Sequence, residues 1–268
     1  MLIVADNLNI MNPAIARALE KRDPAPIHRL VQRCVVAGAQ ALDLNAGPLS
    51  RQPQEKMTFL VETIQSVADL PLVLDTVNPV AMEAGLTACT GSAIINGFSL
   101  EKDKLEHILP LADQFGTDII GYVLGTDSRV PMDESEMMAM VVDLFEAYTK
   151  AGLASRRLII DPIVVPVTWP DGPRHNRGVL SLIRQLPDLL GVPVRTIAGL
   201  SNLSSGGRSL QAKMALEASY LPMLAAAGLD MVLANVFHSK TLAIAKVCGM
   251  LLKEGIFSWA DLNITKLL

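Results

Sequence analysis

Residues 134–162 read ESEMMAMVVDLFEAYTKAGLASRRLIIDP, and they combine a helix, a stop and a buried strand in one unit. Hydrophobic residues recur at helical spacing through residues 134–151, and Gly152 follows where a left-handed residue ends a helix. Residues 158–160 are continuously apolar, which is typical of a strand covered on both faces, and Asp161 follows them. The stretch therefore predicts one unit of a parallel α/β sheet with a polar residue at the carboxyl end of its strand.

The same alternation of helix and apolar strand extends over the chain of 268 residues. Further helices are predicted at residues 27–37, 105–115 and 214–227, each followed by a glycine. Eight strands with eight helices predict a (β/α)8 TIM barrel, a single domain over residues 1–268. An open doubly wound sheet is the alternative, but no G-x-G-x-x-G follows the first strand. The predicted strands are residues 2–5, 41–44, 72–74, 93–95, 118–123, 158–160, 196–200 and 231–234.

Composition excludes several classes of protein. Hydrophobic residues make up 50% of the chain and charged residues 19%, so a large core can form. A net charge of −4, no basic run and only 4% aromatic residues argue against nucleic acids and anionic membranes as partners. The three cysteines lie outside C-x-x-C spacing, which favours a reducing compartment. Without a basic leader or an apolar run of spanning length, we expect a cytoplasmic protein.

Asp, Asn and Ser residues follow the predicted strands, at the end of a barrel where active sites lie. Any one of them could be a turn former or a helix cap. Together they converge on one face, and a buried polar side chain without a partner costs about 1–3 kcal/mol. The set therefore predicts a polar ligand, and it favours a heterocycle rich in donors and acceptors. Its members are Asn7, Asn9, Asp43, Asn45, Asp75, Asn96, Asp161, Ser201, Asn202 and Asn235.

The sequence lacks the residue patterns that other kinds of catalysis require. The four histidines are scattered without metal-ligand spacing, so no metal site is predicted. No lysine or histidine occupies a strand end, and no G-x-S-x-G is present. Gly206-Gly207-Arg208 could hold an anion at a helix start, but the sequence favours a flexible loop there. Residues 165–177, rich in proline and glycine, are predicted to be an irregular loop on the active face.

Several of these strand ends occur together in one known family. The chain contains Leu42-Asp43-Leu44-Asn45-Ala46-Gly47-Pro48, Leu74-Asp75-Thr76, Ile95-Asn96, Ile160-Asp161-Pro162 and Gly199-Leu200-Ser201-Asn202-Leu203-Ser204. In this order they resemble the strand ends of the methyltetrahydrofolate:corrinoid protein methyltransferases, which are related to the folate domain of cobalamin-dependent methionine synthase. The resemblance covers nearly the whole chain, and the Gly-Leu-Ser-Asn-x-Ser stretch is its most specific part.

The resemblance implies a role for each matching residue. Asp75, Asn96 and Asp161 would grip the pyrimidine edge of a pterin, and Ser201 belongs to the same pterin-binding set. Asn202 would be the catalytic side chain, beside the nitrogen 5 that carries the methyl group. Asn9 and Asp43 would shape the floor of the pocket.

One departure from the family pattern lies at the first strand end. The family often has Gly-Glu-Arg-x-Asn there, whereas this chain reads Ala5-Asp6-Asn7-Leu8-Asn9. Any charge pairing that the arginine makes at the rim is therefore missing. The change could also mark a subfamily with a different corrinoid partner or direction.

The implied activity is methyl transfer between a corrinoid protein and nitrogen 5 of tetrahydrofolate, without a metal bound by this chain. The altered first strand end favours a methylated corrinoid protein as donor and tetrahydrofolate as acceptor, giving 5-methyltetrahydrofolate. The corrinoid would arrive on a transient partner, because His175-Asn176-Arg177-Gly178 does not complete a D-x-H-x-x-G motif and His175 is interpreted as a loop histidine. The family also suggests a homodimer.

Four alternatives remain at this point. The methyl group could move in the opposite direction, or the chain could be a dihydropteroate-synthase-like pterin transferase. That second class ends its seventh strand with a catalytic lysine, where this chain has Ser201-Asn202. A non-catalytic pterin-binding subunit and a barrel with a different ligand are the other two.

Overall fold

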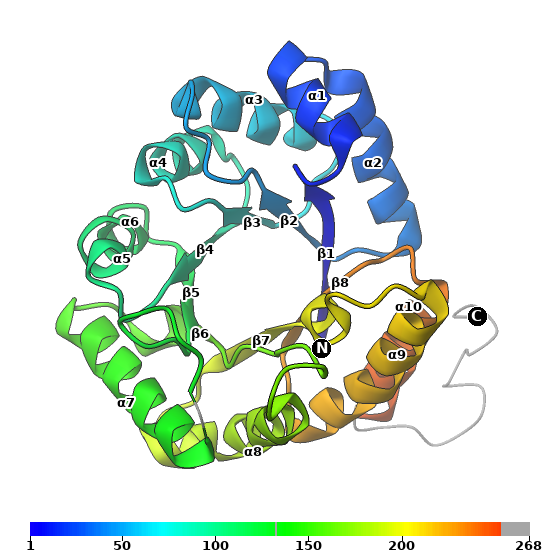
Figure 1. The fold of residues 1–268 in the computed structure, drawn as a ribbon. Helices are drawn as coiled ribbons and strands as arrows, with labels where there is room; N and C mark the ends of the chain where they lie inside the picture. Colours follow the sequence, from blue (N-terminus) through cyan, green and yellow to red (C-terminus); the bar gives the residue numbers. More distant parts are fainter. Residues whose placement is uncertain (132, 253–268) are drawn as a thin grey trace.

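A computed structural model describes residues 1–131 and 133–252. Eight parallel strands close into a barrel in chain order (Figure 1), which confirms the predicted TIM-barrel fold. The predicted domain, residues 1–268, includes residues 253–268, which lie outside the described residues. The strands are β1 (Leu2–Asn9), β2 (Ala41–Asn45), β3 (Leu72–Asp75), β4 (Ala93–Phe98), β5 (Asp118–Tyr122), β6 (Leu158–Asp161), β7 (Arg195–Gly199) and β8 (Met231–Ala234).

Helices surround the barrel (Figure 1), and besides two short 3-10 helices the described residues contain ten α-helices instead of the eight helices predicted. They are α1 (Pro13–Lys21), α2 (Pro24–Ala37), α3 (Pro53–Gln65), α4 (Pro79–Ala88), α5 (Lys102–His107), α6 (Leu109–Gln114), α7 (Glu134–Lys150), α8 (Gly172–Leu190), α9 (Leu210–Ala227) and α10 (Ser239–Leu251). None of the helices in this part of the chain is long and apolar enough to cross a membrane.

The two extra helices have local causes. The first crossover is divided because Arg22 adopts a left-handed conformation (φ 51°) and the Asp23 side chain then caps α2. The single helix predicted at residues 105–115 is divided at Ile108, since Pro110 cannot continue a helix without a clash against the preceding turn. By contrast, Gly38 and Gly228 have φ angles of 100° and 103°, so these two predicted helix stops are confirmed.

The loop predicted at residues 165–177 is shorter than expected. Helix α8 begins at Gly172, because Pro173 lies in the first turn, where the missing N–H of proline is not needed. His175 is therefore a buried helix residue, and its interpretation as a loop histidine was wrong. Its Nε2 lies 2.8 Å from the carbonyl oxygen of Ile163, so it fastens α8 to the segment after β6.

An apolar plug fills the interior of the barrel, with one residue from each strand. Alternate strand residues face the other way and pack under the helices in a second, larger core. The plug consists of Val4, Ala41, Val73, Ile94, Ile120, Ile159, Ile197 and Met231. It closes the barrel from inside, so that only the two ends are open to ligands.

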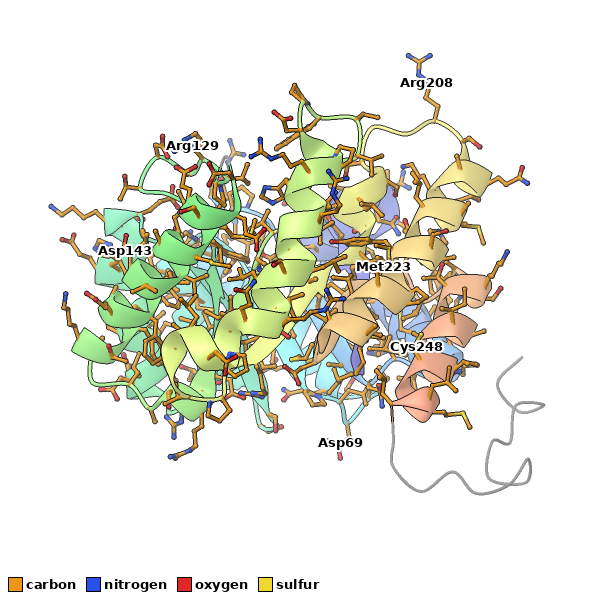
Figure 2. The ribbon with its side chains drawn as sticks, turned by 90° about the horizontal axis from the view of Figure 1, so that it is seen from below. Asp69, Arg129, Asp143, Arg208, Met223 and Cys248 are labelled. Carbon is orange, nitrogen blue, oxygen red and sulfur yellow. The ribbon has the colours of Figure 1, made fainter. Side chains whose placement is uncertain are left out.

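The two ends of the barrel are clearly separated in the side view. Arg129 and Arg208, which follow β5 and β7, lie at one end, while Asp69, which precedes β3, lies at the other (Figure 2). The end with Arg129 and Arg208 is the carboxyl end of the strands, where chemistry is expected in this fold.

Candidate functional site

A layer of polar side chains lies directly above the plug, at the carboxyl ends of the strands. Because strand side chains alternate, the residue two positions after each plug residue faces the same interior. On β7 this residue is Gly199 and on β8 it is Leu233. On the other six strands it is polar, namely Asp6, Asp43, Asp75, Asn96, Tyr122 and Asp161. The interior of the barrel thus changes from aliphatic to polar between two successive layers of inward-facing residues.

Five of these residues come from the consecutive strands β2 to β6, and we call them the acidic wall: Asp43, Asp75, Asn96, Tyr122 and Asp161. Asn96 Nδ2 donates to Asp43 Oδ1 at 3.2 Å, and the Tyr122 hydroxyl donates to Asn96 Oδ1. Beside them, Asn45 Nδ2 donates to Asp75 Oδ2 at 2.5 Å. The structure therefore brings the predicted residues Asp43, Asp75 and Asn96 together.

Each carboxylate of the wall keeps an oxygen without a partner in the described part of the chain. Asp43 and Asp75 each accept one side-chain hydrogen bond, and Asp161 Oδ1 accepts the backbone N–H of Ile163 at 2.8 Å. Within residues 1–131 and 133–252, none of these three carboxylates forms an ion pair with a Lys, Arg or His. The wall therefore presents several acceptors that the protein itself leaves open.

Burial brings the pKa values of Asp161 and Asp75 close to neutral pH. It raises the pKa of Asp161 to about 7, against a smaller lowering by the Ile163 N–H. It raises the pKa of Asp75 to about 6, although the hydrogen bond from Asn45 and the half-buried cation of Lys104 act in the opposite direction. Both carboxyls would become more acidic if a ligand donated hydrogen bonds to them.

The other two titratable groups of the wall are also shifted by their surroundings. Burial, followed by the neighbouring charge of Asp75, raises the pKa of Asp43 well above its usual range. Burial and the carboxylates of Asp75, Asp161 and Asp43 raise the pKa of Tyr122, which keeps its hydroxyl a donor. Negative charge is therefore crowded along the wall, and positive or donor-rich groups of a ligand would relieve it.

The turn after β7, Leu200–Ser204, carries the predicted catalytic residue, and we call it the Asn202 turn. Asn202 is exposed at the barrel mouth, and its side chain forms no hydrogen bond within the described residues. A Cβ atom at Gly199 would lie 3.1 Å from Asn202 Nδ2, so the glycine leaves room for this amide above the end of β7. The predicted binding residue Ser201 is half-buried beside Asp6, where burial raises the pKa of the Asp6 carboxyl and the Ser201 side chain acts in the opposite direction. Its role in binding stays a prediction.

A residue of β1 is hydrogen-bonded to a residue that follows β8, the strand that pairs with β1 where the barrel closes. Asn7 Nδ2 donates to Asn235 Oδ1 at 2.8 Å, so Asn7 makes an amide pair where the family pattern has an arginine. Asn9 pairs in register with Asn45, one inward-facing position above Asp43, and its side chain accepts the N–H of Met11 at 2.8 Å. Asp43 thus lies lower in the barrel than Asn9, and their shared role in a pocket floor stays a prediction.

Two elements of the site were not predicted. Tyr122 lies two residues after the plug residue Ile120, and this spacing could have identified it, but the sequence predicts it only as part of the strand at residues 118–123. Glu217 and His238 are 21 residues apart, and no sequence spacing indicates their contact. Arg208 is exposed and points away from the barrel, so the anion site considered at Gly206-Gly207-Arg208 gains no support (Figure 2).

The sequence matches the family model described as pterin binding enzyme over residues 6–235, which is most of the chain. The chain belongs to the pterin-binding enzyme family. The strand-end residues from Asp6 to Asn235 lie within the matched range. In the described residues, no group of three or more His, Cys, Asp and Glu side chains could hold a metal ion.

Similar curated proteins fall in two groups. The methylcorrinoid:tetrahydrofolate methyltransferase of Eubacterium limosum is 24% identical over 233 residues, which cover 86% of this chain and 83% of that protein. The methionine synthase of Mycobacterium leprae is 24% identical over 78% of this chain, but the match spans only 18% of that longer protein.

Similar solved structures support the fold. A dihydropteroate synthase of Xanthomonas albilineans with 4-aminobenzoic acid has a TM-score of 0.68 and 19% identity, covering 94% of this chain and 93% of its own. The dihydropteroate synthase of Stenotrophomonas maltophilia also has a TM-score of 0.68 and 19% identity, covering 96% and 94%. These likenesses concern the barrel and leave the reaction open.

Proposed function

We propose that this protein transfers a methyl group from a methylated corrinoid protein to nitrogen 5 of tetrahydrofolate, giving 5-methyltetrahydrofolate. The observation that carries the proposal is the pairing of two features at one barrel mouth. One is an acidic wall with open acceptor oxygens, and the other is an exposed Asn202 amide without a partner in the described residues. Membership of the pterin-binding family and the names of the curated relatives support the same reading.

The wall suits the pyrimidine edge of a pterin, which offers adjacent N–H groups. Asp161 has one oxygen on the Ile163 N–H and one that is open, so it can accept a pair of donors from such an edge. Accepting those donors favours the ionised carboxylate and offsets the burial that raises its pKa to about 7. In this proposal Asp161 and Asp75 supply much of the binding free energy.

Asn96 would select the orientation of the ring. Its amide is held at both ends, because Nδ2 donates to Asp43 and Oδ1 accepts from Tyr122. One N–H and one lone pair remain for a ligand, in a direction that these two bonds fix. A heterocycle with an acceptor and a donor side by side can satisfy both, and a flipped ring cannot.

The transfer step changes the charge at nitrogen 5 and at cobalt. The lone pair of nitrogen 5 forms a bond to the methyl carbon, the carbon–cobalt bond breaks, and its electron pair reduces Co(III) to Co(I). The N–H proton of the methylated nitrogen then leaves to solvent. Asn202 can follow this change without titrating, since its amide offers either an oxygen or an N–H.

The corrinoid and the folate are both substrates in this proposal. Exposure of Asn202 leaves the reacting end of the folate open to a partner that presents its cobalt at the barrel mouth. Such a complex would be transient, because the same corrinoid must be methylated again elsewhere. The name of the Eubacterium limosum relative puts methylcorrinoid first, which supports the proposed direction over its reverse. A homodimer stays a prediction.

A dihydropteroate-synthase-like condensation is the second candidate, and the fold likeness to those enzymes is the observation in its favour. Against it, the resemblance places a catalytic lysine at the seventh strand end of that class, where this chain has Ser201 and Asn202. Incubation with a pterin pyrophosphate and p-aminobenzoate tests it directly, and the proposed function requires that no pteroate forms.

The deciding experiment mixes the purified protein anaerobically with tetrahydrofolate and methylcobalamin, or with a methylated corrinoid protein. We expect the methyl-Co(III) spectrum to convert to that of Co(I) while an equal amount of 5-methyltetrahydrofolate forms. Omitting tetrahydrofolate is the control and should leave the spectrum unchanged. Folate binding without any spectral change, with both forms of the corrinoid, would instead mean a non-catalytic pterin-binding subunit.

A further inference from the structure

A buried glutamate lies behind the Asn202 turn. Glu217 belongs to α9, on the outside of the barrel, yet only 3% of it is exposed. Both of its carboxylate oxygens are used, because Oε1 accepts the Ser204 hydroxyl at 2.9 Å and Oε2 lies 2.9 Å from His238 Nδ1. A buried carboxylate is costly unless its oxygens have polar partners, and here each oxygen has one. Its first partner, Ser204, is the last residue of the turn.

A second carboxylate lies near the same turn, inside the barrel. Asp6 is an inward-facing residue of β1, Leu2–Asn9. Burial raises the pKa of Asp6, the nearby Ser201 side chain lowers it, and the charge of Glu217 raises it further. The two carboxylates are thus near enough to interact, and His238 Nδ1 lies 2.9 Å from Glu217 Oε2.

Asn202 lies one residue after Ser201 and two residues before Ser204, the turn residue that Glu217 holds. Its own side chain has no partner in the described residues, so only the turn fixes where the amide stands. Serine hydroxyls that donate to buried carboxylates make stronger bonds than neutral pairs do. A short turn that is held by such a bond two residues after Asn202 has little freedom to move Asn202.

We propose that Glu217 is a positioning residue, which holds the Asn202 turn through Ser204 and thereby fixes the Asn202 amide for methyl transfer. This inference rests on the proposed function, since it gives Asn202 its role at nitrogen 5. It assigns a task to a buried acidic group and a histidine that the binding chemistry of the wall does not use. If the Ser204–Glu217 contact only joined α9 to the barrel, it would contribute to stability without affecting turnover.

The first test removes the contact from each side of the Ser204–Glu217 pair. We expect Ser204→Ala and Glu217→Ala each to lower kcat about tenfold, with the Kd for tetrahydrofolate nearly unchanged, because a misplaced catalytic group slows the reaction step. Glu217→Gln should recover most of kcat, since its amide oxygen still accepts from Ser204. If Glu217→Ala does not fold, Ser204→Ala carries the test alone.

A matched control exists elsewhere in the chain. The Ser181 hydroxyl on α8 donates to Glu134 on α7, so this exposed serine–glutamate bond joins two outer helices and does not involve the Asn202 turn. Ser181→Ala should leave kcat unchanged. Equal kcat values for Ser204→Ala, Ser181→Ala and the unchanged protein would overturn the inference.

A double-mutant cycle separates this inference from the proposed function. If Glu217 acts through Asn202, Ser204→Ala should have little further effect on kcat in an Asn202→Ala protein, and an undiminished tenfold effect there would overturn the inference. The side-chain amide signal of Asn202 in NMR gives a readout that needs no activity. It should be a single sharp pair in the unchanged protein and in Ser181→Ala, and broadened or doubled in Ser204→Ala. A sharp signal in Ser204→Ala would overturn the positioning role, whereas absent methyl transfer with the expected NMR change would overturn the proposed function alone.

Discussion

The two sides of the barrel mouth handle their polar groups in opposite ways. Along β2 to β6, the carboxylates of the acidic wall keep open oxygens and have no ion pair within the described residues. Around β7, β8 and β1, a region that we call the seam, polar groups are paired with one another: Asn7 with Asn235, and Glu217 of α9 with Ser204 and His238. The unpartnered amide of Asn202 is the exception.

This difference separates binding from positioning. A wall of open acceptors is unfavourable in the free protein and becomes favourable when a ligand supplies donors. A seam that satisfies its own groups is rigid before any ligand arrives, and rigidity is what a group that acts in the transition state needs. Substitutions in the wall should therefore change affinity, and substitutions in the seam should change the rate of the transfer step.

The largest effect is expected for Asn202→Ala. Removing a prearranged dipole beside a charge that changes in the transition state should lower kcat about 100-fold, with little change in the Kd for tetrahydrofolate. The rate of loss of the methyl-Co(III) spectrum measures kcat, and calorimetry measures Kd. Gln211→Ala, which removes an exposed amide on α9, is the control and should behave like the unchanged protein. Weaker binding with an unchanged kcat would mean that Asn202 contributes to binding, like the acidic wall, and not to the transfer step.

The next effect is expected for Asp161→Asn, on affinity. The substitution replaces an acceptor by a donor opposite the N–H groups of the pterin, so affinity should fall about 30-fold, while kcat at saturation changes little. Titration calorimetry with tetrahydrofolate measures this. Asp143→Asn, on the outer face of α7, makes the same chemical change away from the mouth (Figure 2) and should have no effect. Undiminished affinity in Asp161→Asn would remove Asp161 from the binding site.

A smaller effect is expected from pH. In the free protein the pKa of Asp161 is about 7 and that of Asp75 about 6, and the proposed ligand binds their ionised forms. Affinity for tetrahydrofolate should therefore rise as pH rises through 7, and it should be about tenfold weaker at pH 6 than at pH 8. In Asp161→Asn the remaining dependence should shift to the lower range set by Asp75. An affinity that falls with rising pH would contradict the proposed contacts.

The sequence predicted the positions of the strands better than the residues at which they end. Each predicted run stopped at its last apolar residue, whereas β2, β3 and β6 continue through Asn45, Asp75 and Asp161. These polar residues keep the strand conformation because they take part in the barrel register and face its interior. Apolar runs show where a strand is buried, but a strand that ends in a functional layer is longer than its apolar part.

Most of the wall could be predicted from sequence, whereas the contact of Glu217 with the seam could not. Asp75, Asn96 and Asp161 each follow an apolar run directly and Asp43 lies within one, so the barrel rule alone gathers them at one end. Glu217 occupies a helix, where an acidic residue usually faces solvent, and it is buried only because α9 packs over the Asn202 turn. Contacts of that kind depend on how the helices pack against the barrel, and no local spacing in the sequence indicates them.

The smallest effect expected is on stability, and here the wall and the seam should differ in sign. Folding raises the pKa of Asp161 to about 7, so the folded state binds more protons than the unfolded state between about pH 4 and pH 7. Its contribution to stability therefore falls as pH rises through that window. Asp161→Asn removes the buried charge and keeps an oxygen for the Ile163 N–H, so the free protein should gain about 1 kcal/mol at pH 8.

Ser204→Ala is the counterpart in the seam. It leaves one oxygen of the buried Glu217 without its donor, so the free energy of unfolding should fall by about 1 kcal/mol at the same pH. Urea denaturation of the two variants and the unchanged protein, without ligand, measures both changes. Because the wall is strained by its open acceptors and the seam is stabilised by its pairs, two variants that shift in the same direction would show that this division of the barrel mouth does not exist.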